Sequence, residues 1–251
     1  MSGGLDAALR RELADLAHRD ALLAFDFDGV LAPLVSDPVT AGVPAATRAR
    51  LARLAERRRC AVLSGRALAD LLPRLAGLPL VACAGNHGAE LEHADPPDGL
   101  RQRVRGWAAE LSARLADQPG LVIEDKGLSL SLHYRHAPDP VGASVAAHAA
   151  ALALPGTRVF GGHDVVNVVP EGAPDKGDAL RALLAETGAS SALYVGDDET
   201  DESVFTLAGE LPLLGVRVGP AAATRAAHVL PSRAEVDALL DALLEGIAAA
   251  A

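Results

Sequence analysis

The chain has few aromatic residues and no long hydrophobic run. Of its 251 residues only 3% are Phe, Trp or Tyr, although half are hydrophobic. A core must therefore be filled mainly by Ala, Leu and Val. No apolar run approaches the roughly 20 residues that span a bilayer. The first twenty residues are charged and helix-patterned, without the apolar segment of a secretory leader. We therefore expect a cytoplasmic protein without a membrane partner.

Positive charge is also scarce. The net charge of −10 at pH 7 argues against nucleic acid as a partner. Of the 23 basic residues only Lys126 and Lys176 are lysine, so each is a candidate for a role that needs a compact ammonium. The two cysteines, Cys60 and Cys83, lie in apolar strand-like runs. We expect buried free thiols there rather than a disulfide.

The first and last parts of the chain share one pattern, in which short apolar strands alternate with helices. Such a pattern is typical of a parallel sheet with helices on both faces. The strands are expected at residues 21–26, 60–64, 79–84, 191–198 and 213–218. The helices are expected at 5–18, 44–58, 66–75, 176–187, 201–208 and 233–248.

A different pattern lies between them, after a Pro-, Gly- and Asp-rich stretch at 93–99. Helices are expected at 100–117 and 140–153, and strands at 121–125, 128–135, 157–160 and 164–169. The run at 128–135 alternates apolar and polar residues, which predicts a half-exposed antiparallel strand. We therefore predict an α/β core made of residues 1–97 and 172–251. An α+β module of order αββαββ, residues 98–171, interrupts it.

The most informative segment is the apolar run at 21–25, because it leads directly into Asp26 and Asp28. Two carboxylates at one strand end repel each other unless a metal or a lysine lies between them. The alternative at this point is an Asp-rich turn that only caps a strand. The choice depends on what the other strand ends carry.

Three more polar segments fall at the same edge of the predicted sheet, where open α/β sheets place their sites. Carboxylates from two strands suit Mg²⁺, and a serine with helix N–H groups suits a phosphate. A lysine adds fixed positive charge, and a carboxylate can act as a nucleophile. The pattern predicts a phosphoryl-transfer site. The segments are Ser64-Gly65-Arg66, Lys176-Gly177 and Gly196-Asp197-Asp198-Glu199-Thr200-Asp201-Glu202.

Taken in order, these motifs resemble those of the haloacid dehalogenase superfamily. They read Asp-x-Asp-Gly-Val, Ser-Gly-Arg, Asp-Lys-Gly and Gly-Asp-Asp-x-Thr-Asp-Glu. With the αββαββ module between the second and third motifs, residues 20–220 are similar to the trehalose-6-phosphate phosphatase branch. The resemblance implies a Rossmann-like core with a C2-type cap. It also implies Mg²⁺-dependent hydrolysis of trehalose 6-phosphate or a closely related disaccharide phosphate. A small sugar phosphate is the expected partner, and a monomer is the default expectation.

The resemblance also assigns roles to the motif residues. Asp26 is implied as the nucleophile and Asp28 as the general acid and base. Mg²⁺ is expected on Asp26, the backbone carbonyl of Asp28 and Asp197, with Asp198 and Asp201 acting through water or by orienting neighbours. Ser64, Gly65 and Lys176 are expected to bind the phosphate.

The residues that the resemblance implies as sugar contacts match the family pattern only in part. Arg66, Glu124, Lys126 and Arg135 match the family pattern, and Asn86 to Glu90 resembles a further family segment. His163, Asn167 and Val169 depart from it, because they replace a lysine, a glutamate and a basic residue. We keep His163 and Asn167 as substrate-binding candidates. An amide accepts and donates hydrogen bonds where a carboxylate only accepts, so substrate choice is open.

Several alternatives to a trehalose 6-phosphate phosphatase therefore stay open. Two of them are phosphatases of other substrates, namely validoxylamine A 7′-phosphate and glucosylglycerol phosphate. The others are a sugar phosphomutase and a non-catalytic binding protein.

Overall fold

The computed structural model describes residues 5–96, 98–162, 164–220 and 223–250. The chain divides into two compact units. The core unit comprises Met1–His93 and Pro174–Ala251, and the inserted unit comprises Ala94–Ala173. The domain limits expected from the sequence, after residues 97 and 171, stay a prediction. Among the described helices none is both long and apolar enough to cross a membrane.

A seven-stranded sheet forms the centre of the core unit, in the order β11-β10-β9-β1-β2-β3-β4. All neighbours are parallel except β3 and β4. The expected parallel sheet is confirmed. The two shortest strands, β4 and β11, were not expected, because two or three residues are too few to show a periodic pattern. The strands are β1 (Ala21–Asp26), β2 (Arg59–Leu63), β3 (Ala82–Gly85), β4 (Glu90–Leu91), β9 (Ser191–Gly196), β10 (Leu213–Val218) and β11 (His228–Leu230).

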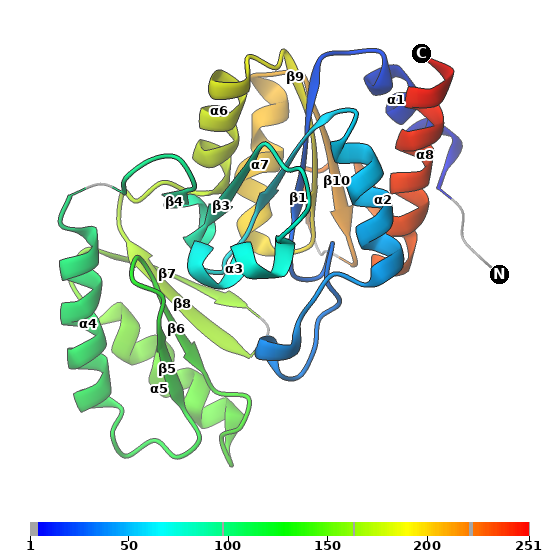
Figure 1. Ribbon diagram of the computed structural model, residues 1–251. Helices are drawn as coiled ribbons and strands as arrows, with labels where there is room; N and C mark the ends of the chain where they lie inside the picture. Colours follow the sequence, from blue (N-terminus) through cyan, green and yellow to red (C-terminus); the bar gives the residue numbers. More distant parts are fainter. Residues whose placement is uncertain (1–4, 97, 163, 221–222, 251) are drawn as a thin grey trace. The chain divides into compact units, whose positions relative to one another are not determined.

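Helices cover both faces of this sheet (Figure 1). One face carries α1 (Ala7–Ala17), α2 (Ala45–Ala55), α3 (Leu68–Leu75) and α8 (Val236–Ala249). The other carries α6 (Lys176–Thr187) and the single-turn α7 (Glu202–Phe205). Alternate side chains of β1 enter the two layers, with Leu23 and Phe25 in the first and Leu22 and Ala24 in the second. Every side chain of β1 is buried because the strand is covered on both faces.

Several turns differ from the expected helices. The helix expected at 201–208 is α7 flanked by the 3₁₀ turns η3 (Glu199–Asp201) and η4 (Thr206–Gly209). A further 3₁₀ turn, η5 (Arg233–Glu235), precedes α8. The remaining 3₁₀ turns are η1 (Pro38–Thr40) and η2 (Asn86–Gly88). Helix ends often tighten in this way, so the differences are local.

The order of the strands places β1 at the point where the chain reverses direction across the sheet. From β1 the chain continues outward through β2 and β3, and it later returns to β9 on the other side of β1. The carboxyl ends of β1, β2 and β9 therefore lie side by side. Open α/β sheets bind ligands at such a switch point.

The inserted unit is a four-stranded antiparallel sheet in the order β5-β6-β8-β7, with two helices. Trp107 and Leu111 pack with Leu132, Val166 and their neighbours in a separate hydrophobic core. The expected αββαββ order is confirmed. The elements are α4 (Leu100–Arg114), β5 (Val122–Asp125), β6 (Leu130–His133), α5 (Pro140–Leu152), β7 (Thr157–Gly162) and β8 (Val165–Pro170).

The strand at 128–135 was expected to expose its polar side chains, and this expectation is wrong for its two serines. Ser129 and Ser131 are each only 1% exposed. The Ser131 hydroxyl donates a hydrogen bond to Oδ1 of Asn167 at 2.8 Å. A buried hydroxyl that is paired in this way carries little penalty, so alternation alone does not predict exposure.

Both cysteines are buried free thiols, as expected. They lie on the neighbouring strands β2 and β3. Burial raises the pKa of the Cys60 and Cys83 thiols to about 12, so neither is a reactive thiolate near neutral pH.

We predict that Leu132→Ala destabilises the inserted unit by about 2–5 kcal/mol, because it opens a cavity in a closed core. Urea unfolding followed by the fluorescence of Trp107, the single Trp, would measure this loss in the same core. The matched control is Val122→Ala on the adjacent strand, whose side chain is 55% exposed. Equal losses in the two variants would contradict the packing described.

Candidate active site

A buried charged centre lies at the carboxyl end of β1. The ammonium of Lys176, the first residue of α6, donates to Oδ2 of Asp26 and to Oδ1 of Asp201, both at 2.7 Å. All three side chains are at least nine-tenths buried. Burial opposes the charge on Lys176, but the carboxylates of Asp201 and Asp26 outweigh burial and raise its pKa. Lys176 is therefore a fixed cation.

Asp26 is held at both carboxylate oxygens. Its Oδ1 accepts the backbone N–H of Phe27 at 2.6 Å, while Oδ2 faces Lys176. Burial raises the pKa of the Asp26 carboxyl well above its ordinary value. Lys176 opposes this rise, and the nearby carboxylates of Asp201 and Asp197 add to it. The centre thus has less positive charge than its carboxylates require.

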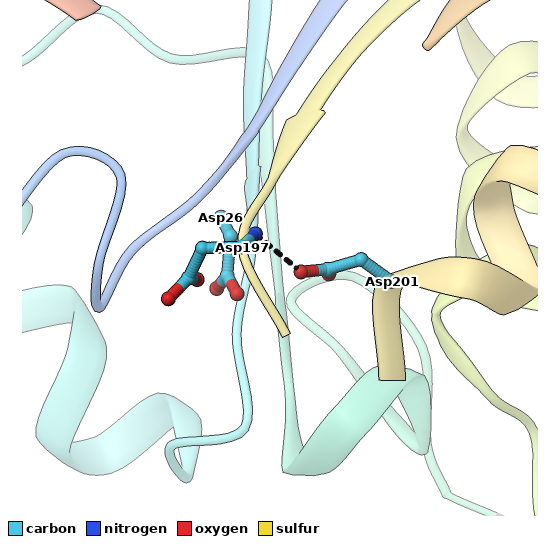
Figure 2. A group of neighbouring side chains, drawn as sticks. All are labelled: Asp26, Asp197 and Asp201. Atoms are coloured by element: carbon cyan, nitrogen blue, oxygen red, sulfur yellow. Dashed lines mark hydrogen bonds between the residues drawn. The ribbon is translucent and has the colours of Figure 1, made fainter. Parts of the chain in front are cut away.

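Asp201 has four hydrogen-bond donors around its carboxylate. Oδ1 accepts from Lys176 and from the phenol of Tyr194, the latter at 2.6 Å. Oδ2 accepts the backbone N–H groups of Asp197 and Asp198, both at 2.8 Å, and Figure 2 shows the first of these bonds. Because both oxygens are engaged, Asp201 is placed to orient Lys176 and the loop after β9.

Asp197 contrasts with Asp201. Within the described part of the chain its carboxylate accepts no hydrogen bond, and Figure 2 shows it beside the carboxylate of Asp26. A Cβ on Gly29 would lie 1.9 Å from Oδ2 of Asp197, so the carboxylate rests against bare backbone. Gly29 also has φ +75°, which favours glycine. Burial raises the pKa of Asp197 to about 7, with Asp201 as the next cause and Lys176 opposing.

These residues fit a divalent cation. Carboxylate oxygens of Asp26, Asp197 and Asp201 lie within 4.8 Å of one another and face a single ammonium. Asp201 is already satisfied, which leaves Asp26 and Asp197 with lone pairs to offer. Hard carboxylate oxygens in such a cluster are the ligands that Mg²⁺ and Ca²⁺ prefer. The aspartate cluster can therefore hold a metal.

The loop after β9 is anchored by two residues that the sequence did not single out. Arg217 on β10 donates to the carbonyl oxygens of Asp197 at 2.8 Å and Asp198 at 3.0 Å. Tyr194 on β9 donates its phenol hydrogen to Oδ1 of Asp201 and so holds that carboxylate in place. Both residues occur inside apolar strands. A single polar side chain among apolar neighbours was the only signal in the sequence that could have identified them. Asp198 itself caps η3 by accepting the N–H of Glu199 at 2.7 Å.

Asp28 is paired with Arg66. The guanidinium donates from Nε to Oδ2 at 2.7 Å and from Nη2 to Oδ1 at 2.9 Å. Asp28 lies two residues after Asp26, in the turn that follows β1. The structure therefore joins the proposed acid and base to an arginine that the sequence assigned to the sugar.

Ser64 is fully buried at the end of β2, and its hydroxyl accepts the backbone N–H of Arg66 at 3.2 Å. The ring of His87 packs on Gly65, where a Cβ would lie 2.4 Å from Cε1. The backbone of His87 donates to the Ser64 carbonyl at 3.0 Å. His87 has φ 58°, so a left-handed turn holds the Ser64-Gly65 backbone in place.

The turn that contains His87 also reaches the lysine. At Gly88, with φ +102°, a Cβ would lie 2.1 Å from the carbonyl oxygen of Asp175. Asp175 is the N-cap of α6 and precedes Lys176. The 86–88 turn therefore packs against Gly65 and against the backbone that leads into Lys176.

The remaining candidates lie in the inserted unit. Glu124 and Asn167 both lie opposite Ser131, on either side of β6. Oδ1 of Asn167 accepts from Ser131, and Oε2 of Glu124 is 2.9 Å from Nε2 of His133. The ammonium of Lys126 is 3.9 Å from Oε2 of Glu124. In the same unit, Arg135 donates to Asp164 at 3.2 Å. His163 lies outside the described residues.

We predict that divalent cation binding weakens as the pH falls through 7. The pKa of Asp197 is about 7, so below that pH the cation must displace a proton, while above it the carboxylate is already ionised. Calorimetric titration with Mg²⁺ between pH 5.5 and 8.5 would measure this as an affinity that rises with pH and then levels. Asp197→Asn should remove most of the binding, and a flat profile for the unaltered protein would contradict the assignment.

Several known proteins are similar to this chain over most of its length. A family model described as trehalose-phosphatase matches residues 24–229. A trehalose-phosphate phosphatase of Mycobacterium avium is 37% identical over 234 residues, 87% of this chain and 57% of the relative. One from Mycobacterium tuberculosis is 38% identical over 221 residues, 81% of this chain and 56% of the relative. The chain thus spans about half the length of these curated relatives.

Solved structures share the fold. The C-terminal domain of Candida albicans trehalose-6-phosphate phosphatase is similar with a TM-score of 0.77 and 22% identity, over 98% of each chain. A trehalose-6-phosphate phosphatase related protein is similar with a TM-score of 0.71 and 23% identity, over 91% of this chain and all of that one. The family match covers most of the chain and confirms the resemblance drawn from the four motifs. The chain belongs to the trehalose-phosphatase family of the haloacid dehalogenase superfamily.

Proposed function

We propose that the chain is a Mg²⁺-dependent phosphatase of trehalose 6-phosphate or a closely related disaccharide phosphate. The observation that carries the proposal is the buried carboxylate of Asp26, held between the Phe27 N–H and the Lys176 ammonium beside a second carboxylate, that of Asp197. Membership of the trehalose-phosphatase family supports the substrate class. A cytoplasmic location and a sugar phosphate as the only partner remain predictions.

Asp26 and Asp197, with the backbone carbonyl of Asp28, are the proposed ligands of Mg²⁺. Asp198 and Asp201 are proposed to orient this set, in keeping with the four donors that occupy Asp201. When bound, the ion would supply positive charge that offsets the repulsion between the phosphate and the carboxylates.

Lys176, Ser64 and Gly65 are proposed to bind the phosphate. A phosphate charge 4 Å from the Asp26 carboxylate is repelled by about 4 kcal/mol at an effective dielectric near 20. The ammonium of Lys176, 2.7 Å from Asp26, opposes this repulsion at the point of attack. The Ser64 hydroxyl accepts the N–H of Arg66, which leaves its own proton to donate to a phosphate oxygen.

The proposed reaction has two displacements at phosphorus. In the first, an oxygen of Asp26 bonds to phosphorus as the bond to the sugar oxygen breaks, and Asp28 gives its proton to that leaving oxygen. In the second, Asp28 takes a proton from water, whose oxygen bonds to phosphorus as the bond to Asp26 breaks. The products are the free sugar and inorganic phosphate, and both aspartates return to their initial state.

We predict that Asp26→Asn abolishes phosphate release, because an amide is a far weaker nucleophile, while the fold persists. Phosphate release from trehalose 6-phosphate with Mg²⁺, and with EDTA as the control, would measure the loss. Circular dichroism would check the fold. A variant that keeps a near-normal rate would rule out Asp26 as the nucleophile. Product analysis would reveal a mutase, which moves the phosphate instead of releasing it.

Sugar selection is proposed to lie with Glu124, Lys126, Arg135, His163 and Asn167 in the inserted unit. Asn167 is the informative member. Ser131 donates to its Oδ1, and we propose that its Nδ2 hydrogens donate to the sugar. A carboxylate at this position would only accept hydrogen bonds. This difference keeps phosphates of trehalose-like pseudodisaccharides and glucosylglycerol as alternative substrates.

We predict that kcat/KM for trehalose 6-phosphate exceeds that for simple hexose phosphates, because a hexose leaves polar groups of the inserted unit unpaired. A phosphate-release screen that includes validoxylamine A 7′-phosphate and glucosylglycerol phosphate would rank the substrates. Asn167→Glu should change kcat/KM for the disaccharide phosphates by about tenfold, the equivalent of one hydrogen bond. Turnover of 4-nitrophenyl phosphate is the control and should not change. A preference for hexose phosphates would contradict the substrate class.

A further inference from the structure

Arg66 makes a two-pronged contact with Asp28. Nε and Nη2 donate to separate oxygens of the carboxylate, at 2.7 and 2.9 Å. The Arg66 side chain is 12% exposed, whereas that of Asp28 is 35% exposed. A short carboxylate at the surface samples several rotamers unless a partner selects one. Paired N–H groups of a guanidinium are well suited to this selection because they match both oxygens in one plane.

Arg66 is itself held from several directions. Nη1 donates to Oδ2 of Asp70 on α3 at 2.6 Å, and Nη2 donates to the carbonyl oxygen of Pro38 at 3.0 Å. The guanidinium carbon lies 5.4 Å from the centre of the Phe27 ring. The backbone N–H of Arg66 bonds to the Ser64 hydroxyl. Arg66 is therefore rigid, and it links the turn after β1 to the turn after β2.

The donors of Arg66 are almost fully used within the core unit. A guanidinium has five N–H groups. Two go to Asp28, one to Asp70 and one to the Pro38 carbonyl, so contacts with the described residues leave a single N–H for any ligand. Recognition of a sugar by paired hydrogen bonds would require at least one of these contacts to break. The contacts favour a role toward Asp28 over a role toward the sugar.

We propose that Arg66 is a positioning residue for the acid and base Asp28, with Asp70 holding Arg66 in place. This inference rests on the proposed function, because it concerns the same reaction. A carboxylate aimed at the leaving oxygen matters most when that oxygen needs a proton to leave. A sugar alkoxide needs one, whereas 4-nitrophenolate is stable without one. Loss of Arg66 should therefore slow the first displacement more on sugar phosphates than on aryl phosphates.

The test compares Arg66→Met with the unaltered protein on trehalose 6-phosphate and on 4-nitrophenyl phosphate, both with Mg²⁺. Misplacement of a general acid lowers kcat for the sugar phosphate by about 10- to 100-fold. KM for the sugar phosphate and the single-turnover rate of 4-nitrophenolate release are expected to change by less than about threefold, because neither depends on that proton. Steady-state kcat for 4-nitrophenyl phosphate is not the readout, because the second displacement needs Asp28 as base with either substrate. Arg66→Lys keeps the positive charge but lacks the paired N–H groups, and it should show the same selective loss.

A double-mutant cycle with Asp28→Asn separates positioning from other roles. If Arg66 acts only through Asp28, Arg66→Met causes no further loss once Asp28 is altered. The matched control is Arg181→Met on α6, which removes an exposed ion pair with Glu210 and should leave the rates on both substrates unchanged. Asp70→Asn weakens the contact that holds Arg66 to α3 but keeps the paired hydrogen bonds from Arg66 to Asp28. It should produce a smaller loss with the same selectivity, and it serves as the test if Arg66→Met does not fold.

Three outcomes would overturn the inference. A raised KM for the sugar phosphate with kcat preserved would make Arg66 a sugar ligand. Equal losses in the first displacement on both substrates, with a lowered Tm, would make it structural, and full activity in Arg66→Lys would show that charge alone suffices. If the unaltered protein releases phosphate from neither substrate, the proposed function fails first, so the two failures are distinguishable.

Discussion

The buried ion pairs of Lys176 are the interaction on which the site depends. One ammonium stands between two carboxylates, and the contact to Asp26 joins residues 150 positions apart in the sequence. Removing the ammonium would leave two uncompensated carboxylates in the interior, which is strongly destabilising. The strand end of β1 and the first turn of α6 must therefore meet, and this requirement aligns the two parts of the core unit that the insertion separates.

Around this centre the protein uses backbone and buried polar groups to place each carboxylate differently. Asp201 receives four donors and becomes a fixed support, whereas Asp197 lies against the backbone of Gly29 and accepts no hydrogen bond from the residues that the structure describes. Three chemically identical side chains thereby acquire separate roles. Arg217 and Tyr194 maintain the difference, because they hold the loop after β9 and the carboxylate of Asp201. The same logic applies to Arg66, which selects one orientation of Asp28.

Chemistry and substrate choice are assigned to different units of the chain in our proposal. The core unit holds every residue assigned to phosphoryl transfer, and the inserted unit holds the residues assigned to the sugar, Arg66 excepted. The structure places Arg66 in the core network with Asp28 and Asp70. In the inserted unit, Ser131 sets the orientation of the Asn167 amide. On this proposal, substrate specificity can vary through residues such as Asn167 without disturbing the carboxylates.

The sequence by itself determined the class of the fold and the set of catalytic candidates. Apolar strands, helical spacing and the motifs around Asp26, Ser64 and Asp197 are local patterns, and local patterns follow from periodicity and residue chemistry. Tertiary structure alone decided which partner each polar side chain has. Tyr194 and Arg217 look like ordinary strand residues, and Ser131 looks exposed, until neighbouring strands bring Asp201, the 197–198 carbonyls and Asn167 beside them. Hydrogen bonds between residues far apart in the chain depend on the packing of the sheets, which no local pattern encodes.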